Sequence, residues 1–191
     1  MIRLTLPIRS WFRRFRVEER GSIAVEGVVM VVPILILFFS AFVFFHAFRL
    51  STLNDKAGYV VADMLSRQTE PVNDNFLNGL QDVYAFLMRN QGELPRMRVS
   101  LITFDADAQA YGVVWSQSTS DGTLAPEVLT NAIVAQVADR IPVMPDGENV
   151  LLVETFVDYT PPVNVGIGAR TFSTFIVTRP RYAPQIVYAG S

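Results

Sequence analysis

The chain has 191 residues, of which 50% are hydrophobic and 18% are charged, an apolar balance for one domain with accessory segments. It contains no cysteine, which excludes disulfides, iron–sulfur clusters, thiol nucleophiles and thiolate zinc sites. The net charge of −2 is divided unevenly: residues 1–21 carry six arginines against two glutamates, for +4, and residues 22–191 carry ten basic and sixteen acidic side chains, for −6. An acidic body argues against nucleic-acid binding, because neutralising phosphates needs a cationic surface.

Residues 1–21 form a basic leader, and an uncharged run, GVVMVVPILILFFSAFVFF at 27–45, follows it. As a helix, the 19 residues of this run would be roughly 28 Å long, about the thickness of the hydrocarbon layer of a membrane. The run is apolar on all faces, which favours a membrane span over a buried core helix. Pro33 removes one helical hydrogen bond and is expected to kink or loosen the span, as lipid-embedded helices tolerate.

Arginines before the run predict its orientation. Only Arg49 and Lys56 follow within twenty residues of its end, so the positive-inside rule places the leader in the cytoplasm and residues 46–191 outside. A cleaved signal peptide is disfavoured, because the run exceeds the usual apolar region and no small-residue cleavage site follows it. The leader residues to which we assign the orientation are Arg13, Arg14, Arg16 and Arg20.

Glu26 stands immediately before the uncharged run. A carboxylate at the edge of a span costs on the order of 2–3 kcal/mol, so such residues usually have a partner. Two interpretations remain open from the spacing alone. Glu26 either extends to the membrane surface or pairs with a charge on another subunit. Small residues that suit a processing site, Gly21 and Ser22, lie just upstream.

The N-terminal pattern of a basic leader, Gly-Ser-x-Ala-Val-Glu and a long apolar helix with an internal proline resembles the TadE/TadG-like family, the minor pseudopilins of tight adherence (Tad) pilus systems. TRPR at 178–181 resembles an ending that such domains often show. Gly27 departs from the family, which often has a bulky residue there, and major pilins are much shorter than this chain; both points favour a minor component. The residues that carry the resemblance are Arg20, Gly21, Ser22, Ala24, Val25, Glu26 and Pro33.

This resemblance implies a function in pilus assembly. A prepilin peptidase would cut after Gly21, leaving Ser22 as the first mature residue and Glu26 as the fifth. The subunit would sit in the bacterial inner membrane with its C-terminal domain in the periplasm, and its partners would be other pilin or pseudopilin subunits. Some members keep their leader, so the alternative is an uncleaved, single-pass membrane-anchored binding or assembly module facing the periplasm.

The helix is predicted to continue beyond the membrane to residue 67. Its apolar residues recur there at spacings of three and four, which indicates a packing seam. The seam either faces the core of the same domain or is shared between subunits, and both are compatible along different lengths. Its members are Leu50, Leu53, Ala57, Val60 and Met64.

Residues 68–191 read as an exported α+β domain. A second helix is predicted after a cap at Asn73 or Asp74, ending near residues 89–92, and a third over residues 126–140, opened by Pro126. Their apolar stripes are Phe76, Leu80, Val83 and Leu87 in the second helix, and Leu129, Ile133 and Val137 in the third.

Four strands are predicted at 97–104, 110–118, 149–159 and 170–179, with turn signals DG at 121–122 and 146–147 and a linking segment at 161–169. The predicted fold class is α+β: a long N-terminal transmembrane helix, then an antiparallel sheet of about four strands with flanking helices on one face. The three segments are the leader 1–21, the helix 22–67 and the domain 68–191.

Catalytic chemistry has few candidates. His46, the only histidine, falls at the outer end of the span, where a Ser-His-Asp triad is implausible. Asp105 and Asp107 lack the further ligands and glycine of a calcium loop, and GIG at 166–168 is too short for a phosphate cradle. Trp115 is expected to pack in the sheet. We therefore predict a non-enzymatic protein without cofactor, metal or small-molecule substrate, and disfavour an anchored hydrolase.

Overall fold

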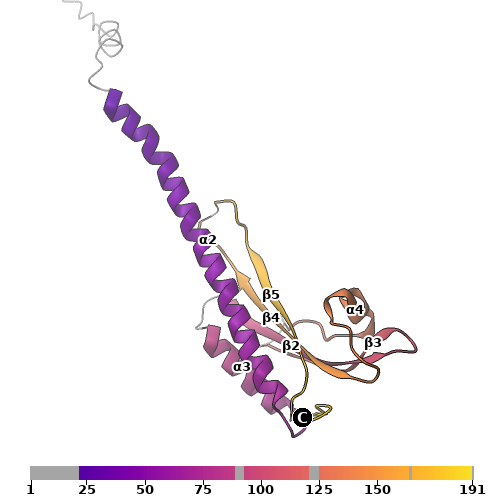
Figure 1. Cartoon of the computed structure of the whole chain (residues 1–191). Helices are drawn as coiled ribbons and strands as arrows, with labels where there is room; N and C mark the ends of the chain where they lie inside the picture. The colour runs from indigo at the N-terminus through magenta and orange to yellow at the C-terminus, as the bar shows by residue number, and fades with distance from the viewer. Residues whose placement is uncertain (1–21, 89–92, 121–124, 164, 191) are drawn as a thin grey trace, which may run out of the picture.

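The computed structural model describes residues 22–88, 93–120, 125–163 and 165–190 (Figure 1). One long helix runs from the N-terminal side into a domain built on a four-stranded antiparallel sheet. The predicted α+β class is therefore confirmed for the fold. The elements are α2 (Ser22–Ser66), β1 (Val72–Asn73), α3 (Asp74–Met88), β2 (Glu93–Asp105), β3 (Ala110–Thr119), α4 (Asn131–Gln136), the 3-10 turn η2 (Ala138–Arg140), β4 (Asn149–Tyr159), β5 (Arg170–Thr178) and β6 (Tyr188–Gly190).

Helix α2 confirms the predicted element at 22–67 to within one residue. It comprises 45 residues and continues through Pro33 without interruption. Ser40 is the polar residue in the apolar run. Its hydroxyl donates a hydrogen bond of 2.7 Å to the carbonyl oxygen of Ile36, so its donor is satisfied within the helix. The N–H of Gln68 donates to the carbonyl oxygen of Leu65 and closes the last turn.

The sheet has the strand order β3-β2-β4-β5, and every neighbouring pair is antiparallel. β4 coincides with its predicted range, β5 ends one residue early, and β2 begins four residues before its predicted start. The side chains of the central strands are buried on both faces, which explains why β4 reads as a nearly continuous apolar run. A register shift in the β2–β3 pair at Leu101 and Ile102 marks a bulge in the sheet.

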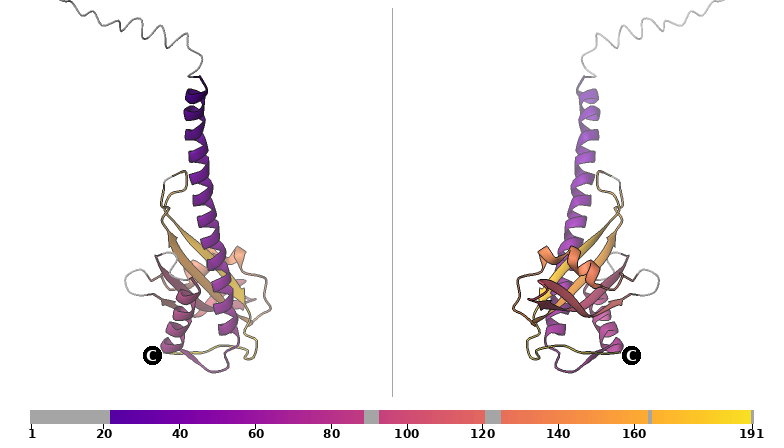
Figure 2. Two further views of the ribbon diagram at one scale, coloured as in Figure 1. Left: turned by 90° about the vertical axis from the view of Figure 1, so that its left-hand side faces the viewer. Right: turned by 90° about the vertical axis from the view of Figure 1, so that its right-hand side faces the viewer.

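Helices cover both faces of the sheet, which corrects the prediction of helices on one face. Alternate residues of a strand point to opposite faces, so each central strand feeds two cores. Leu101 and Leu151 face α2 and α3, whereas Ile102 and Leu152 face α4 and the segment after it (Figure 1). The side views in Figure 2 show the same arrangement, with α2 and α4 on opposite sides of the sheet.

The third helix is much shorter than the predicted 126–140. The side chain of Thr130 accepts a hydrogen bond from the N–H of Ile133, so the helix begins after Thr130 rather than at Pro126. Leu129 is buried but precedes the helix, and its N–H donates to the hydroxyl of Ser116 on β3 at 2.8 Å. Residues 125–130 are therefore not helical, with Leu129 held to the edge strand β3, and only Asn131–Gln136 and η2 are helical in this part of the described chain.

Helix α3 begins where it was predicted, since Asn73 Oδ1 accepts the N–H of Phe76 at 2.9 Å. Its predicted apolar stripe was partly correct: Leu80 is buried, and the half-buried Phe76 and Leu87 pack against the core, but the most buried positions lie one residue further along. Both phases carry apolar side chains, and packing selects the one that includes Tyr84. The residues that face the core are Leu77, Leu80, Tyr84 and Met88.

A small parallel pair, β1 with β6, was not predicted. The N–H of Val72 donates to the carbonyl oxygen of Val187, and Trp115 Nε1 donates to that of Ile186, so the C-terminal segment closes one end of the core. The Asp146-Gly147 turn, with φ of 68° at Gly147, confirms the turn predicted at 146–147. The turn predicted at 121–122 lies outside the described residues.

Candidate functional site: the projecting half of the long helix

Helix α2 divides at Val43 into two halves with different surroundings. From Ile23 to Phe42 no side chain is buried, and large apolar groups such as that of Leu37, 71% exposed, point outward on every side. We call residues 23–42 the projecting half and residues 43–66 the packed half. Figures 1 and 2 show most of the projecting half extending beyond the domain.

The projecting half has the dimensions of a membrane span. Its twenty residues correspond to roughly 30 Å of helix, which is about the thickness of the hydrocarbon layer. Among the residues that the structure describes, α2 is the one helix long and apolar enough to cross a membrane. This is consistent with membrane anchoring. The predicted span at 27–45 overlaps it but extends past Val43, which already belongs to the core of the domain.

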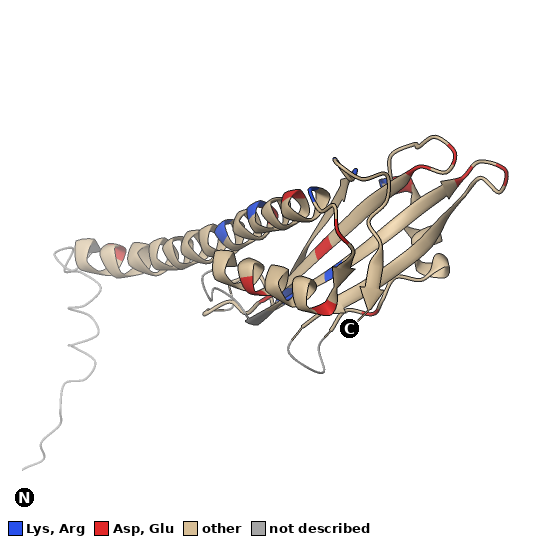
Figure 3. Cartoon of the chain, turned by 90° about the horizontal axis from the view of Figure 1, so that it is seen from below, with Lys and Arg blue, Asp and Glu red and all other residues tan. Residues whose placement is uncertain are grey.

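Glu26 lies on this half, exposed, within the second turn of α2. Its carboxylate forms no ion pair or hydrogen bond with any residue that the structure describes. At the neighbouring Gly27 an added Cβ would meet no atom of the described chain within 4 Å, so the packing of this chain does not explain that glycine. In Figure 3 the single acidic position near the start of α2 precedes a long uncharged stretch, which ends at the first basic positions.

The remaining predicted site residues lie at or before the edge of the described chain. Ser22 is the first residue of α2, so the proposed cleavage point would leave a chain that begins directly with helix. Outside the described residues lie Gly21 and the orientation residues Arg13, Arg14, Arg16 and Arg20.

At the junction between the two halves, the end of β4 meets α2. The hydroxyl of Tyr159 donates to the carbonyl oxygen of Val43 at 3.2 Å. The Tyr159 ring also lies 5.7 Å from that of His46 and 5.8 Å from that of Phe172, between ring centroids. His46 therefore sits at the outer end of the apolar run, as predicted, in an aromatic cluster. Sequence reasoning did not single out Tyr159.

In the packed half, a polar network fixes α2 against its neighbours. Asn54 is 1% exposed; its amide Nδ2 donates to Thr174 on β5 at 2.9 Å, and its Oδ1 accepts the hydroxyl of Tyr84 on α3. Thr174 in turn donates to Asp55 at 2.6 Å. Burial raises the pKa of the Tyr84 phenol above its ordinary value of 10.0, so the group stays neutral. Three elements are thus joined at one point along α2.

The predicted seam of the packed half is only partly correct. Leu50 and Ala57 face the core, but Val60 is 43% exposed and Met64 38% exposed, because the buried residues of the last turns are Val61 and Leu65. The core-facing interpretation therefore holds for the first members of the seam. Val60 and Met64 are free to contact another subunit. The second interpretation, a seam shared between subunits, therefore remains open for these two residues.

A close approach of α2 to the sheet occurs at Gly58. A Cβ there would lie 3.0 Å from Ile176 Cδ1 and 3.4 Å from Thr155 Oγ1, so a larger residue would fit only if these side chains moved. Because a lone glycine in a helical pattern carries no information about its neighbours, the sequence did not identify this contact.

The candidates for chemistry have structural roles where they are described. Asp105 Oδ1 accepts the N–H groups of Asp107 and Ala108 at 2.9 Å each, which makes the segment a hairpin turn. Trp115 is half-buried in the core, and Ile167, at the centre of GIG, is buried. No group of three or more His, Cys, Asp or Glu residues that could hold a metal ion occurs within the described ranges.

Two ion pairs lie on the α4 side of the sheet and join β2 to β4. Arg98 contacts Glu154 at 2.6 Å, with both side chains 10% exposed, and Arg98 Nη1 also donates to the carbonyl oxygen of Glu127. Arg96 Nη2 donates to both carboxylate oxygens of Asp158 at 2.8 Å. Each pair links the two neighbouring strands, and within each pair the opposite charges compensate one another. This arrangement suits a structural role.

Comparison of the chain with protein-family models, with curated proteins and with solved structures finds no match in any of the three. The functional argument therefore rests on the N-terminal sequence pattern and on the geometry of α2.

Proposed function

We propose that this protein is a non-enzymatic minor pseudopilin-like subunit that takes part in assembling a Tad-type (type IVb/Flp) pilus or secretion apparatus. The observation that carries the proposal is the projecting half of α2: twenty residues, apolar and exposed on all sides, with Glu26 near its start. Such a surface needs a covering of lipid or of other apolar helices, and a pilus subunit uses both at different stages.

In this proposal the leader lies in the cytoplasm, the projecting half crosses the bacterial inner membrane, and the domain lies in the periplasm. A prepilin peptidase removes residues 1–21, which leaves a charged α-amine at Ser22. Because Ser22 and Glu26 both belong to α2, the new amine and the carboxylate would lie on one short stretch of helix.

Glu26 has the chemistry of an assembly residue. Its exposed carboxylate has no partner among the described residues and must be compensated within the membrane. The amine of a neighbouring subunit at ~4 Å would attract it by about 4 kcal/mol in a medium of effective dielectric ~20. That attraction offsets a burial cost on the order of 2–3 kcal/mol, and it favours one register between subunits. The open space at Gly27 leaves room for a close neighbour.

Processing is tested by intact mass and N-terminal sequencing of the protein extracted from its native membrane, beside a Gly21→Ala variant. A mature chain that begins at Ser22, and that is lost in the variant, is the expected result. A terminus at Met1 in both proteins would overturn the trimmed-pseudopilin proposal. The alternative, an uncleaved anchored module that binds a periplasmic partner, would then take its place.

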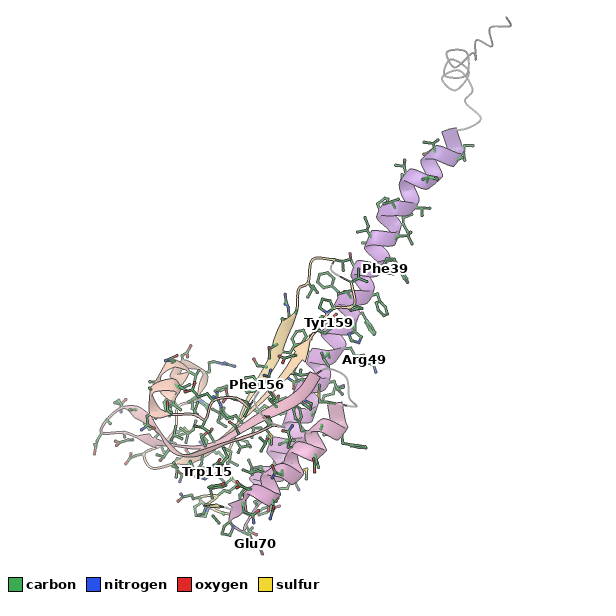
Figure 4. The ribbon with its side chains drawn as sticks, turned by 180° about the vertical axis from the view of Figure 1, so that it is seen from behind. Phe39, Arg49, Glu70, Trp115, Phe156 and Tyr159 are labelled. Carbon is green, nitrogen blue, oxygen red and sulfur yellow. The ribbon has the colours of Figure 1, made fainter. Side chains whose placement is uncertain are left out.

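The role of Glu26 is tested by comparing Glu26→Gln with Glu70→Gln. Glu70 is also exposed, but it lies past the other end of α2, far from the projecting half (Figure 4). We expect Glu26→Gln to reduce co-purification of wild-type subunits or pilus output, while Glu70→Gln leaves both unchanged. Equal behaviour of the two variants would remove the assembly role of Glu26 and leave processing untouched.

A further inference from the structure

The segment between β4 and β5, residues 160–169, is here called the β4–β5 loop. Its sequence, TPPVNVGIGA, contains no charged residue. The structure describes all of it except residue 164. In Figures 1 and 2 the loop extends from the sheet toward the N-terminal side of the molecule and runs beside α2. In Figure 4 it rises past Tyr159 to the neighbourhood of Phe39, which belongs to the projecting half.

The loop is held in this place by its inner side chains. Ile167 is buried and Val165 is half-buried, and both pack into the core cluster that includes Val43 of α2. Pro161 and Pro162 restrict the backbone at the start of the loop. A segment fixed in this way presents its other side chains in a defined direction.

The outer side of the loop is apolar and uncovered. Val163 is 44% exposed, and Pro162, Gly168 and Ala169 are exposed as well. None of these four residues has a charged or hydrogen-bonding side chain; the exposed Thr160, at the start of the loop, has a hydroxyl. The loop lies beside the end of the projecting half that contains Phe39. A bilayer that covers the projecting half as far as Phe39 would therefore reach the loop.

The surroundings of the loop fit the boundary between acyl chains and headgroups. Arg170, which follows the loop, and Arg49 of α2 are both exposed and lie on the domain side of it, where lipid phosphates would be. Tyr159 and His46 form the aromatic cluster at the same junction. Aromatic rings and basic side chains at this depth are typical of membrane interfaces.

We propose that the β4–β5 loop is a second membrane contact, and that its Pro162 and Val163 rest in the headgroup region of the outer leaflet of the inner membrane. A single helix would let the domain rotate about the anchor, whereas the loop adds a contact point to one side of α2. It therefore fixes which face of the domain is turned toward the lipid. This inference rests on the membrane anchoring included in the proposed function.

The absence of cysteine allows the test to be made on the full chain with single-cysteine variants. Val163→Cys reports on the loop, Leu37→Cys on the anchor, and Val128→Cys is a matched control, since Val128 is 45% exposed but lies beside the far edge of the sheet. Each is labelled with the environment-sensitive fluorophore NBD and reconstituted into phosphatidylethanolamine and phosphatidylglycerol vesicles, with and without lipids that carry a quenching doxyl group near the headgroup.

We expect the label at position 163 to shift to shorter emission wavelengths and to be quenched by the shallow doxyl lipid, whereas the label at 128 does neither. The label at 37 should be shifted and should be quenched better by a deep doxyl group than by a shallow one. If the label at position 37 behaves in this way but the label at 163 behaves like that at 128, the loop does not contact the membrane although α2 anchors the chain.

Two other outcomes would also overturn the inference. A label at 163 that is shifted but not quenched by any lipid would indicate that protein, such as a neighbouring subunit, covers the loop. A label at 37 that remains in water would show that α2 does not anchor the chain, and the loop contact would fail with it. Processing after Gly21 is measured separately and is unaffected by either result.

Discussion

The projecting and packed halves of α2 belong to one continuous helix, yet they are built for different surroundings. In the projecting half the apolar side chains surround the helix, and none of them is buried by the chain itself. In the packed half one side is buried, where Val43, Ala47 and Leu50 begin a stripe that faces α3, β4 and β5. Large apolar side chains on the other side stay exposed at its start, namely Phe44, Phe45 and Phe48. The outer side of that half carries charges such as Arg49 and Lys56.

This difference shows how one element can be both an anchor and part of a core. The packed half is held by tertiary contacts, which supply most of the stability of helices in proteins. The projecting half has no such contacts and exposes far more apolar surface than a soluble monomer tolerates. Since the helix continues through Val43, the orientation of the anchor and that of the domain are coupled.

The largest effect is expected from removing the same atoms in each half. Leu50 is 1% exposed and Leu37 is 71% exposed. Leu50→Ala should lower the free energy of unfolding of the domain by about 2–5 kcal/mol, because it leaves a cavity in the core. Leu37→Ala should leave it unchanged. Urea unfolding of the full chain in detergent, followed by tryptophan fluorescence, measures both. Equal losses would contradict the division of α2 at Val43.

The two halves were not equally predictable from the sequence. The projecting half is apolar in every direction, so its identity as a long exposed helix did not depend on phase. In the packed half the sequence has apolar residues at adjacent positions, such as Val60 and Val61, and the periodicity alone selected the wrong one. Only contact with the sheet, at Gly58 above all, decides which side turns inward.

The same distinction holds in the rest of the domain. β4 was predicted at its true bounds because a long apolar run stands between two turn signals. The predicted helix at 126–140 was too long because Pro126 is a common first residue of a helix. The side chain of Thr130 instead caps the helix, which therefore starts at Asn131. β6 could not be predicted, since three residues pair with a strand more than a hundred positions away. For the candidate site, the sequence predicted that Glu26 lies on a helix. It cannot identify a partner of Glu26 on another chain.

A second way to sharpen the comparison is to disrupt the polar network that occurs only in the packed half. Asn54→Ala removes the partner of both Tyr84 and Thr174. Leaving buried polar groups unsatisfied should lower the free energy of unfolding by about 1–3 kcal/mol. Ser40→Ala, in the projecting half, removes a hydrogen bond within the helix only and is the control. Thermal unfolding of both variants in detergent checks this, and an unchanged Asn54→Ala protein would show that the network contributes nothing.

A third test uses pH, which should act on the packed half alone. Burial raises the pKa of Tyr84 above 10.0, so an unfolded chain loses this proton at lower pH than the folded one. The contribution of Tyr84 is fully present below pH 10 and declines above it, by up to about 1.4 kcal/mol per pH unit. Tyr84→Phe should lack this decline. The hydrogen bond to Asp74 raises the pKa of Tyr188 as well, but Tyr188 is present in both proteins and cancels in the comparison.

The measurement is the free energy of unfolding of wild type and Tyr84→Phe between pH 8 and pH 11, values that bracket the ordinary pKa of 10.0. The wild-type curve should fall more steeply above pH 10 than that of the variant. Parallel curves would mean that the Tyr84 hydroxyl reaches solvent in the folded protein, which would contradict its burial against α2.

The smallest effect is expected where the packed half ends, at Asp63. Its carboxylate contacts Arg67 and Arg181 at 2.9 Å each, but these groups are 39–53% exposed. Ion pairs in water contribute little, so Asp63→Asn should cost less than about 1 kcal/mol, and the loss should shrink further as salt is raised. Asp82→Asn, an exposed carboxylate on α3, is the matched control. The N–H of Arg181 also donates to the carbonyl oxygen of Ser66, so this residue ties the C-terminal segment to the end of α2. A loss as large as that of Leu50→Ala would mean that this segment, rather than the apolar stripe, holds α2 on the domain.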